Sequence, residues 1–132
     1  MLREFTFDVT EYKQPREELG AADEPVDLRQ IEALGGPDFA AEVLQVFYAE
    51  ANAELRTMRE AGAQDDASRL AQAAHALKGS SGAVGARRLV AFCRQLESAA
   101  QARDLTPVPG LLDELEAEIE RVGVFVVGYR GY

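Results

Sequence analysis

The sequence predicts an all-α protein that folds as an antiparallel up-down four-helix bundle with a short leading N-terminal helix. Its 132 residues suffice for one domain with one core, and 47% of them are hydrophobic. Good helix formers, namely Ala, Leu, Glu, Arg and Gln, fill most of residues 38–120. Four apolar stripes recur there at spacings of three and four, and short connections separate them. Short connections make neighbouring helices antiparallel, and one-sided stripes need a shared interior, so a bundle satisfies both.

Residues 1–26 differ from the rest and are predicted to form an N-terminal extension or arm. Phe5, Phe7 and Val9 alternate with other residues, as in a short strand or an arm laid on the body. Two partners for them stay open, the apolar stretch 124–127 and a kinase. The following stretch, EELGAADEP, is acidic and holds a glycine and a proline, which predicts a loop or linker.

The stretch VDLRQIEAL predicts the leading helix, with Asp27 as its N-cap and Gly35 and Gly36 at its end. Pro37 suits the first turn of the long helix that follows, because that turn leaves its backbone N–H groups unused. Gly62 is expected to close this long helix. Its apolar stripe comprises Leu44, Phe47, Ala51, Leu55 and Met58, with Phe39 and Val43 alongside.

Asp65 or Asp66 is expected to open the next helix as its N-cap. The stripe of this helix comprises Ala67, Leu70, Ala74, Leu77, Ser81 and Val84. A further helix begins after Gly85. Its stripe comprises Leu89, Phe92, Leu96 and Ala99, with Cys93 on the border.

The stretch DLTPVPG predicts a turn before the last helix, since it contains two prolines and a glycine. The stripe of the last helix comprises Leu112, Leu115, Ile119, Val122 and Val126. Gly123 and Gly128 weaken the end of this helix. The bundle is therefore predicted to span residues 27–127, and residues 128–132 are predicted to fray.

Composition and charge argue against several classes of function. The formal net charge of −9 repels phosphate backbones, so we expect no nucleic-acid partner. The single cysteine, Cys93, cannot form an internal disulfide and suits a reducing compartment. No apolar run is long enough to span a membrane, and the first 25 residues lack the apolar stretch of a signal peptide. We therefore expect a cytoplasmic protein without a membrane partner.

The only histidine, His75, lies in the stretch AAHALKGSSGAVGARRL, which contains three glycines. At 100° per residue and with Leu77 as reference, the apolar stripe of this helix centres at about 30°. His75 then lies roughly 130° from that centre, and Gly79 about 170° from it. Gly82 falls close beside the histidine, and Lys78 stands on the flank. The ring is therefore predicted to point into solvent above a strip cleared of side chains.

This strip predicts a surface on which another protein can approach the histidine. Ser68 and Gln72 share the face with Gly79 and Gly82, so all four are candidate docking residues. A helical glycine lowers stability by about 1 kcal/mol relative to alanine. On this interpretation the protein gives up that stability so that a partner can approach His75. The alternative is a solvated histidine whose neighbouring glycines only mark the end of the helix.

Other candidate groups near this face have weaker support. Arg69 and Arg87 are candidate docking residues, and Arg88 is a third arginine in the same region, although single surface arginines often serve solubility alone. Cys93 is interpreted as a packing residue. A Cys–His catalytic pair or metal site is not expected, because the two side chains point to opposite sides of the bundle.

The sequence resembles the histidine-containing phosphotransfer (HPt) family over about residues 27–126. The family pattern runs from a histidine through two residues to Lys-Gly, small residues, an aliphatic residue and a glycine. The matching residues here are His75, Ala76, Leu77, Lys78, Gly79, Ser80, Ser81, Val84 and Gly85. The downstream stretch CRQLE also fits, within a helix that carries Leu89, Cys93, Leu96 and Glu97.

The resemblance implies a four-helix bundle and a phosphorelay intermediate without its own ATP-dependent kinase activity. His75 would accept a phosphoryl group from a receiver-domain aspartate and pass it to another receiver. Lys78 would stabilise charge near the phosphate, and Gly79 would leave room for the receiver. The implied partners are response-regulator receivers and a histidine kinase or hybrid kinase. The protein itself needs no cofactor, and Mg²⁺ is expected on the receiver.

Two other functions remain open from the sequence. The first is a helical-bundle adaptor that carries no phosphate. The second is a phosphotransfer domain excised from a larger histidine kinase. A complete ATP-driven kinase is the weakest alternative, because no Gly-rich nucleotide motif occurs and only 57 residues follow His75.

Overall fold

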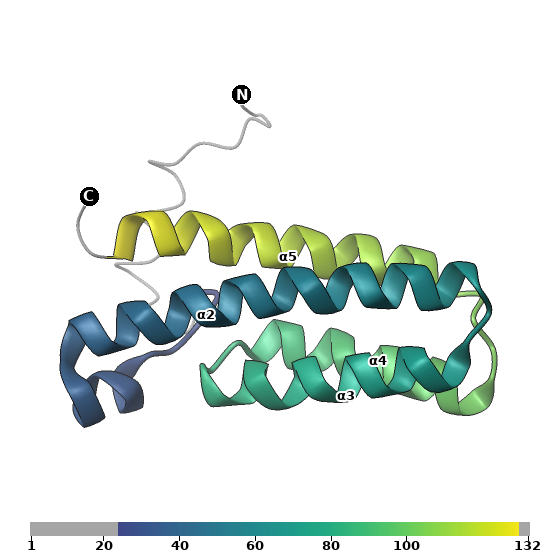
Figure 1. The fold of residues 1–132 in the computed structure, drawn as a ribbon, viewed down its shortest axis with the longest axis horizontal. Coiled ribbons are helices and arrows are strands. Elements are labelled where there is room, and N and C mark those ends of the chain that lie inside the picture. The colour runs from purple at the N-terminus through teal and green to yellow at the C-terminus, as the bar shows by residue number, and fades with distance from the viewer. Residues whose placement is uncertain (1–23, 130–132) are drawn as a thin grey trace.

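The computed structural model describes residues 24–129, and this part of the chain forms four helices (Figure 1). They are α2 (Arg29–Ala63), α3 (Ala67–Ala83), α4 (Arg87–Ala102) and α5 (Val108–Tyr129). α2 and α5 lie side by side above α3 and α4, and each helix packs against two others to close a ring. Connections of three to five residues join the helices in sequence. The predicted all-α antiparallel bundle is confirmed.

The interior is built from the apolar stripes of all four helices. Two large and fully buried side chains from each helix form its centre: Leu44, Met58, Leu70, Leu77, Leu89, Leu96, Leu115 and Ile119. Burying one such side chain contributes about 1.5–3 kcal/mol relative to leaving it exposed. This interior fixes the rotation of each helix and therefore determines which residues reach the surface.

The leading helix predicted before Pro37 is present as the first part of α2. Gly36 has φ 85° and ψ 177°, which interrupts the helix and lets the chain change direction at the Gly-Pro pair. The predicted N-cap is displaced by one residue, since Leu28 occupies the cap position. Asp27 still accepts hydrogen bonds from the Arg29 backbone N–H at 3.2 Å and from its side-chain Nε at 2.9 Å. The bonded Arg29 side chain lowers the pKa of Asp27 to about 2.

The segment before α2 is part of the bundle, so the structure corrects the predicted boundary at residue 26. Val26 is 1% exposed, and the backbone N–H of Asp27 donates to the carbonyl of Val84 at 2.9 Å. Gly85 has φ +69°, and a Cβ at this position would lie 2.7 Å from Cβ of Asp27. The chain entering α2 is thus held against the α3–α4 connection. Residues 1–23, including Phe5 and its apolar neighbours, lie outside the described part of the chain.

The connection between α2 and α3 differs slightly from the prediction. Gly62 lies inside the last turn of α2, and Asp65 adopts the left-handed conformation with φ 56°. The N–H of Asp66 then returns to the carbonyl of Ala61 at 2.8 Å, so the turn closes without a glycine. The Asp66 side chain accepts from the Arg69 N–H at 3.1 Å, which confirms the predicted cap of α3.

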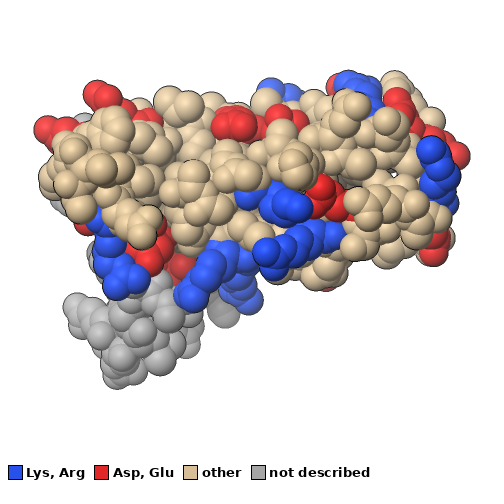
Figure 2. Space-filling view, turned by 90° about the horizontal axis from the view of Figure 1, so that it is seen from below, with Lys and Arg blue, Asp and Glu red and all other residues tan. Residues whose placement is uncertain are grey.

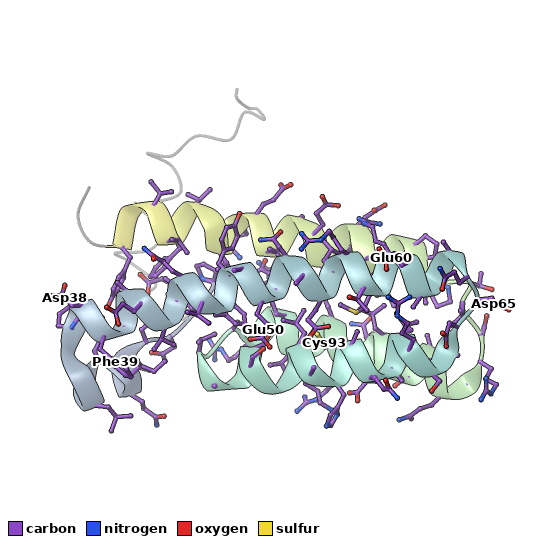
Figure 3. The ribbon with its side chains drawn as sticks, viewed as in Figure 1. Asp38, Phe39, Glu50, Glu60, Asp65 and Cys93 are labelled. Atoms are coloured by element: carbon purple, nitrogen blue, oxygen red, sulfur yellow. The ribbon has the colours of Figure 1, made fainter. Side chains whose placement is uncertain are left out.

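α4 is rotated relative to its predicted stripe. Cys93 is fully buried, whereas Phe92 is only partly buried against the core. Figure 3 shows Cys93 pointing into the space between the helices. α4 therefore presents the cysteine, which the sequence placed on the border, to the interior.

α5 begins earlier, ends later and is rotated slightly relative to the prediction. It starts at Val108, so Pro109 and Gly110 occupy its first turn rather than a preceding loop. Near its end Phe125 is buried and Val126 only partly so. Glu118, which no stripe included, is buried, and two hydrogen bonds from Arg121, each 3.1 Å long, offset the cost of burying its carboxylate.

The predicted fraying at residues 128–132 is wrong for the first two of them. The helix continues through Tyr129, whose hydroxyl donates to the carboxylate of Glu32 in the first part of α2. Burial and the neighbouring carboxylate raise the pKa of Tyr129 to about 12. Its ring also lies 5.7 Å from that of Phe125. These contacts offset the helix-weakening effect of Gly128, while residues 130–132 lie outside the described range.

Candidate functional site

His75 stands in the middle of α3 and projects into solvent. Its side chain is 74% exposed, whereas Ala74 and Leu77, on the opposite side of the same helix, are fully buried. The buried stripe and the Asp66 cap fix the rotation and start of α3, so the imidazole is held outward. The predicted outward orientation of the only histidine is confirmed.

A carboxylate from the neighbouring helix holds the imidazole. Oε2 of Glu97, on α4, lies 2.9 Å from Nδ1 of His75. Its other oxygen, Oε1, accepts a hydrogen bond from Nζ of Lys78 at 2.6 Å. Lys78 is one turn after His75 on α3, so the carboxylate of Glu97 can contact both residues that the sequence predicts to act in the chemistry.

Glu97 is charged and mostly shielded from water. Its side chain is 14% exposed, against 29% for Lys78. Burial acts to raise the pKa of Glu97, but the hydrogen bonds from Lys78 and His75 and their charges outweigh it and leave the pKa below its ordinary value. A carboxylate anion therefore faces Nδ1 at neutral pH.

This arrangement distinguishes the two ring nitrogens. A carboxylate only accepts hydrogen bonds, so Nδ1 carries the proton and donates it to Glu97. In the neutral imidazole Nε2 then holds the lone pair, and this nitrogen has no hydrogen-bond partner among residues 24–129. The site presents one nucleophilic nitrogen toward solvent on a ring that cannot turn freely.

The strip beside the histidine is open. A Cβ placed on Gly79 or Gly82 would meet nothing within 4 Å. Ser68 and Gln72 are also exposed on α3, about two turns and one turn before His75. The structure therefore leaves space around the imidazole where a second protein can approach.

The two predicted docking arginines lie in different places. Arg69 turns toward α2, where its Nη2 donates to Oε1 of Glu60 at 2.9 Å. Glu97 reaches His75 from α4, on the other side of α3, so Arg69 lies away from the bonded pair. Arg87 is exposed in the first turn of α4, the helix that carries Glu97.

Cys93 takes no part in this surface. Burial raises the pKa of its thiol to about 12, and the nearby Glu97 charge acts in the same direction. The thiol is therefore neutral and packed in the interior, as the sequence indicated.

Within residues 24–129, no three His, Cys, Asp or Glu side chains converge as a metal ligand set. None of the four described helices combines the length and apolar composition that crossing a membrane requires.

Glu97, which contacts both His75 and Lys78, is the candidate site residue to which the sequence assigned no role. One signal could have singled it out, since it is the first acidic residue after an acid-free run, residues 67–96. Its contact with His75 depends on how α4 is rotated against α3. The structure shows that rotation, whereas the stripes predicted it only approximately.

Comparisons with known proteins agree with this geometry. The family model described as the Hpt domain matches residues 42–124. Two proteins of Arabidopsis thaliana are similar to the chain. Histidine-containing phosphotransfer protein 2 is 28% identical over 73% of this chain, and protein 5 of the same name is 37% identical over 51%. The matches span 64% and 45% of the lengths of these relatives.

A solved structure shares the fold. The histidine-containing phosphotransfer protein HptB from Pseudomonas aeruginosa PAO1 superposes with a TM-score of 0.76 and is 27% identical. The match covers 82% of this chain and 96% of that one. Because the family model matches more than half of the chain and a solved member has the same bundle, the chain belongs to the Hpt domain family.

Proposed function

We propose that this protein is a phosphorelay intermediate in two-component signalling. In this role His75 accepts a phosphoryl group from the aspartate of one receiver domain and passes it to another receiver. The observation that supports this most directly is the imidazole itself, which is exposed on a cleared helix surface and bound through Nδ1 to Glu97. Membership of the Hpt domain family supports the same role.

The transfer step follows from the arrangement of the ring. The Nε2 lone pair attacks the phosphorus atom, the N–P bond forms, and the P–O bond to the aspartyl group breaks to release a carboxylate. Positive charge develops on the ring, and the Glu97 carboxylate at Nδ1 stabilises it. Lys78, at the edge of the site, offsets the negative charge of the transferred group. The reverse sequence returns the group to a second receiver.

The partner completes the site. Phosphoryl transfer needs in-line positioning and neutralisation of charge on the phosphoryl oxygens, usually by Mg²⁺. The carboxylate beside His75 is already engaged by Lys78, so we place the Mg²⁺ ion on the receiver. A receiver, either free or part of a hybrid histidine kinase, is accordingly the expected source of the phosphoryl group, and we expect the bundle itself to have no ATP-dependent kinase activity.

A transfer assay tests this function against the adaptor alternative. The protein is mixed with Mg²⁺ and receiver domains that carry phosphate on aspartate. We expect phosphate to move to this protein in a form that is labile to acid and stable to alkali, as a phosphoramidate is. An adaptor would bind a receiver without gaining phosphate, and that outcome would refute the proposal.

Two substitutions of Gly79 distinguish its effect on the stability of the bundle from its effect on the approach of a receiver to His75. Gly79→Ala should increase the free energy of unfolding by up to about 1 kcal/mol, because alanine favours the helix and its Cβ meets open space. Gly79→Leu should fold equally well but slow transfer, because its side chain occupies the docking strip. Chemical denaturation measures the first effect, and the transfer assay measures the second. Unimpaired transfer by the leucine variant would show that the strip does not admit a partner.

Replacing Glu97 tests its effect on the choice of nitrogen. In Glu97→Ala we expect His75 to populate both neutral tautomers, and transfer to slow by about tenfold, since part of the protein then lacks the Nε2 lone pair. Nitrogen-15 NMR of the ring reports the tautomers directly. A variant that keeps a single Nδ1–H tautomer and transfers normally would show that Glu97 does not position the ring.

Glu97 should also affect how the free energy of unfolding decreases at acidic pH. The pKa of Glu97 is lower in the folded protein than in the unfolded chain, so its ionisation stabilises the fold above the unfolded pKa. This contribution is lost as the pH falls through the folded pKa. Glu97→Ala should therefore flatten the decrease of unfolding free energy that begins near the unfolded pKa of about 4.3 and continues down through the lower folded pKa, relative to the unaltered protein.

A further inference from the structure

Charge is distributed unevenly along this acidic chain. None of its 23 acidic residues lies between positions 67 and 96, although five of its basic residues do. The structure folds this run into all of α3 and most of α4. The five basic residues are Arg69, Lys78, Arg87, Arg88 and Arg94.

The fold places this run on the side of the bundle that carries His75. Figure 2 views the molecule from the α3 and α4 side and shows several Lys and Arg side chains gathered across it. The only acidic residue of these two helices is Glu97, whose carboxylate is bound by Lys78 and His75. The surface formed by α3 and α4, called the α3–α4 face below, is therefore basic on a protein of net charge −9.

Two of the five basic residues lie at the edges of this face. Arg69 is bound to Glu60 on α2. Arg88 turns toward α5, where its Nη1 lies 3.9 Å from the buried carboxylate of Glu118. Both side chains are therefore directed away from the contact between Glu97 and His75.

Arg87 and Arg94 lie closer to the centre of the face. They are seven residues apart, or about two helical turns, so they share one side of α4. Arg94 is also one turn before Glu97, which places it beside the carboxylate that holds His75. Both arginines are exposed, and Arg94 has no ion-pair partner among residues 24–129.

An exposed cation in this position acts on a partner before contact. Charges at a protein surface attract oppositely charged partners over about 8–10 Å at physiological ionic strength. Such attraction mainly raises the association rate and discriminates between partners, with less effect on the chemical step. The acidic residues of α2 and α5 would at the same time disfavour approach of an acidic partner from those sides.

We infer that the α3–α4 face selects receivers by charge, with Arg94 as the principal specificity residue and Arg87 as its support. The preferred receiver carries acidic side chains on the docking surface that faces α4, in addition to the acidic pocket that receivers have around the phosphorylated aspartate. This inference rests on the proposed phosphorelay function and adds to it which receivers are served. Arg94 acts on encounter and orientation, whereas His75 and Glu97 act on the transfer itself.

The test measures transfer kinetics against ionic strength. Receiver domains from the same genome are phosphorylated with a small-molecule phosphodonor and mixed rapidly with the full chain. For the receiver that reacts fastest, Arg94→Ala should lower the second-order rate constant about five- to tenfold at low salt. The first-order rate constant at saturating receiver should stay within twofold. The difference from the unaltered protein should shrink in 0.5 M salt, since salt screens the attraction.

Arg56→Ala is the matched control. It removes the same charge from an exposed helical position, but on α2, outside the α3–α4 face. The inference is overturned if Arg94→Ala behaves like Arg56→Ala, or if its defect persists unchanged in high salt. Circular dichroism of both variants shows that the bundle is intact. If the unaltered protein accepts no phosphate from any receiver, the proposed function itself fails and this inference fails with it.

Discussion

Replacing His75 with glutamine should abolish phosphoryl transfer and leave the bundle folded. The glutamine amide offers no nucleophilic nitrogen, so we expect the rate to fall by at least about a thousandfold, to the background of the assay. Stability should change by less than about 1 kcal/mol, because the His75 side chain is 74% exposed and belongs to no core contact. Retained phosphate is measured after quenching, and the free energy of unfolding by denaturant titration.

Measuring both transfer and stability separates a chemical role of His75 from a structural one. Loss of transfer with an unchanged free energy of unfolding assigns the chemistry to this ring. Transfer that persists in the variant would move the phosphorylation site elsewhere and contradict the assignment. Loss of both transfer and folding would contradict the expectation, drawn from its exposure, that the imidazole adds little to the stability of the fold.

Gly85→Ala should be the most damaging small substitution for the fold, with a loss of about 3 kcal/mol in the free energy of unfolding. Its φ of +69° is strained for alanine, and a Cβ would lie 2.9 Å from the backbone N and O of Asp27. Relief requires the segment entering α2 to move away, which also weakens the 2.9 Å hydrogen bond from Asp27 to Val84. Denaturant-induced unfolding, followed by circular dichroism, measures the loss.

Gly82→Ala is the control for this substitution. It lies three residues earlier in the same segment, is helical, and has nothing within 4 Å of an added Cβ. We expect it to be neutral or stabilising by less than about 1 kcal/mol. Equal stability of the two variants would show that the contact between Gly85 and Asp27 does not hold the bundle together.

The sequence predicted the parts of this protein that depend on periodicity. Burial follows the apolar spacing on each helix, so the stripes correctly predict that Leu44, Leu77, Leu96 and Ile119 lie in the core. The same geometry placed His75 outward. The resemblance to the HPt family was carried by a short motif around this residue, and the structure places that motif on α3 and the turn after it, with His75 and Gly79 exposed and Leu77 and Ser81 buried.

Features that depend on contacts between distant segments were not predicted. Glu97 meets His75 only through the rotation of α4 against α3, and Cys93 replaces Phe92 in the interior for the same reason. Glycine propensity alone predicted fraying after residue 127, but the bond from Tyr129 to Glu32 joins positions 97 residues apart. Gly85 was expected as the boundary between two helices and as the last glycine of the family pattern, whereas the structure adds its close approach to the segment before α2.

The most direct test of the account is NMR spectroscopy of the phosphorylated, nitrogen-15-labelled protein. Coupling between phosphorus and nitrogen identifies the ring nitrogen that carries the phosphoryl group. We predict this coupling at Nε2 of His75, with a proton retained on Nδ1 where Glu97 accepts it. Coupling at Nδ1, or phosphate on any other residue, would contradict the claim that Glu97 directs Nε2 of His75 toward the partner.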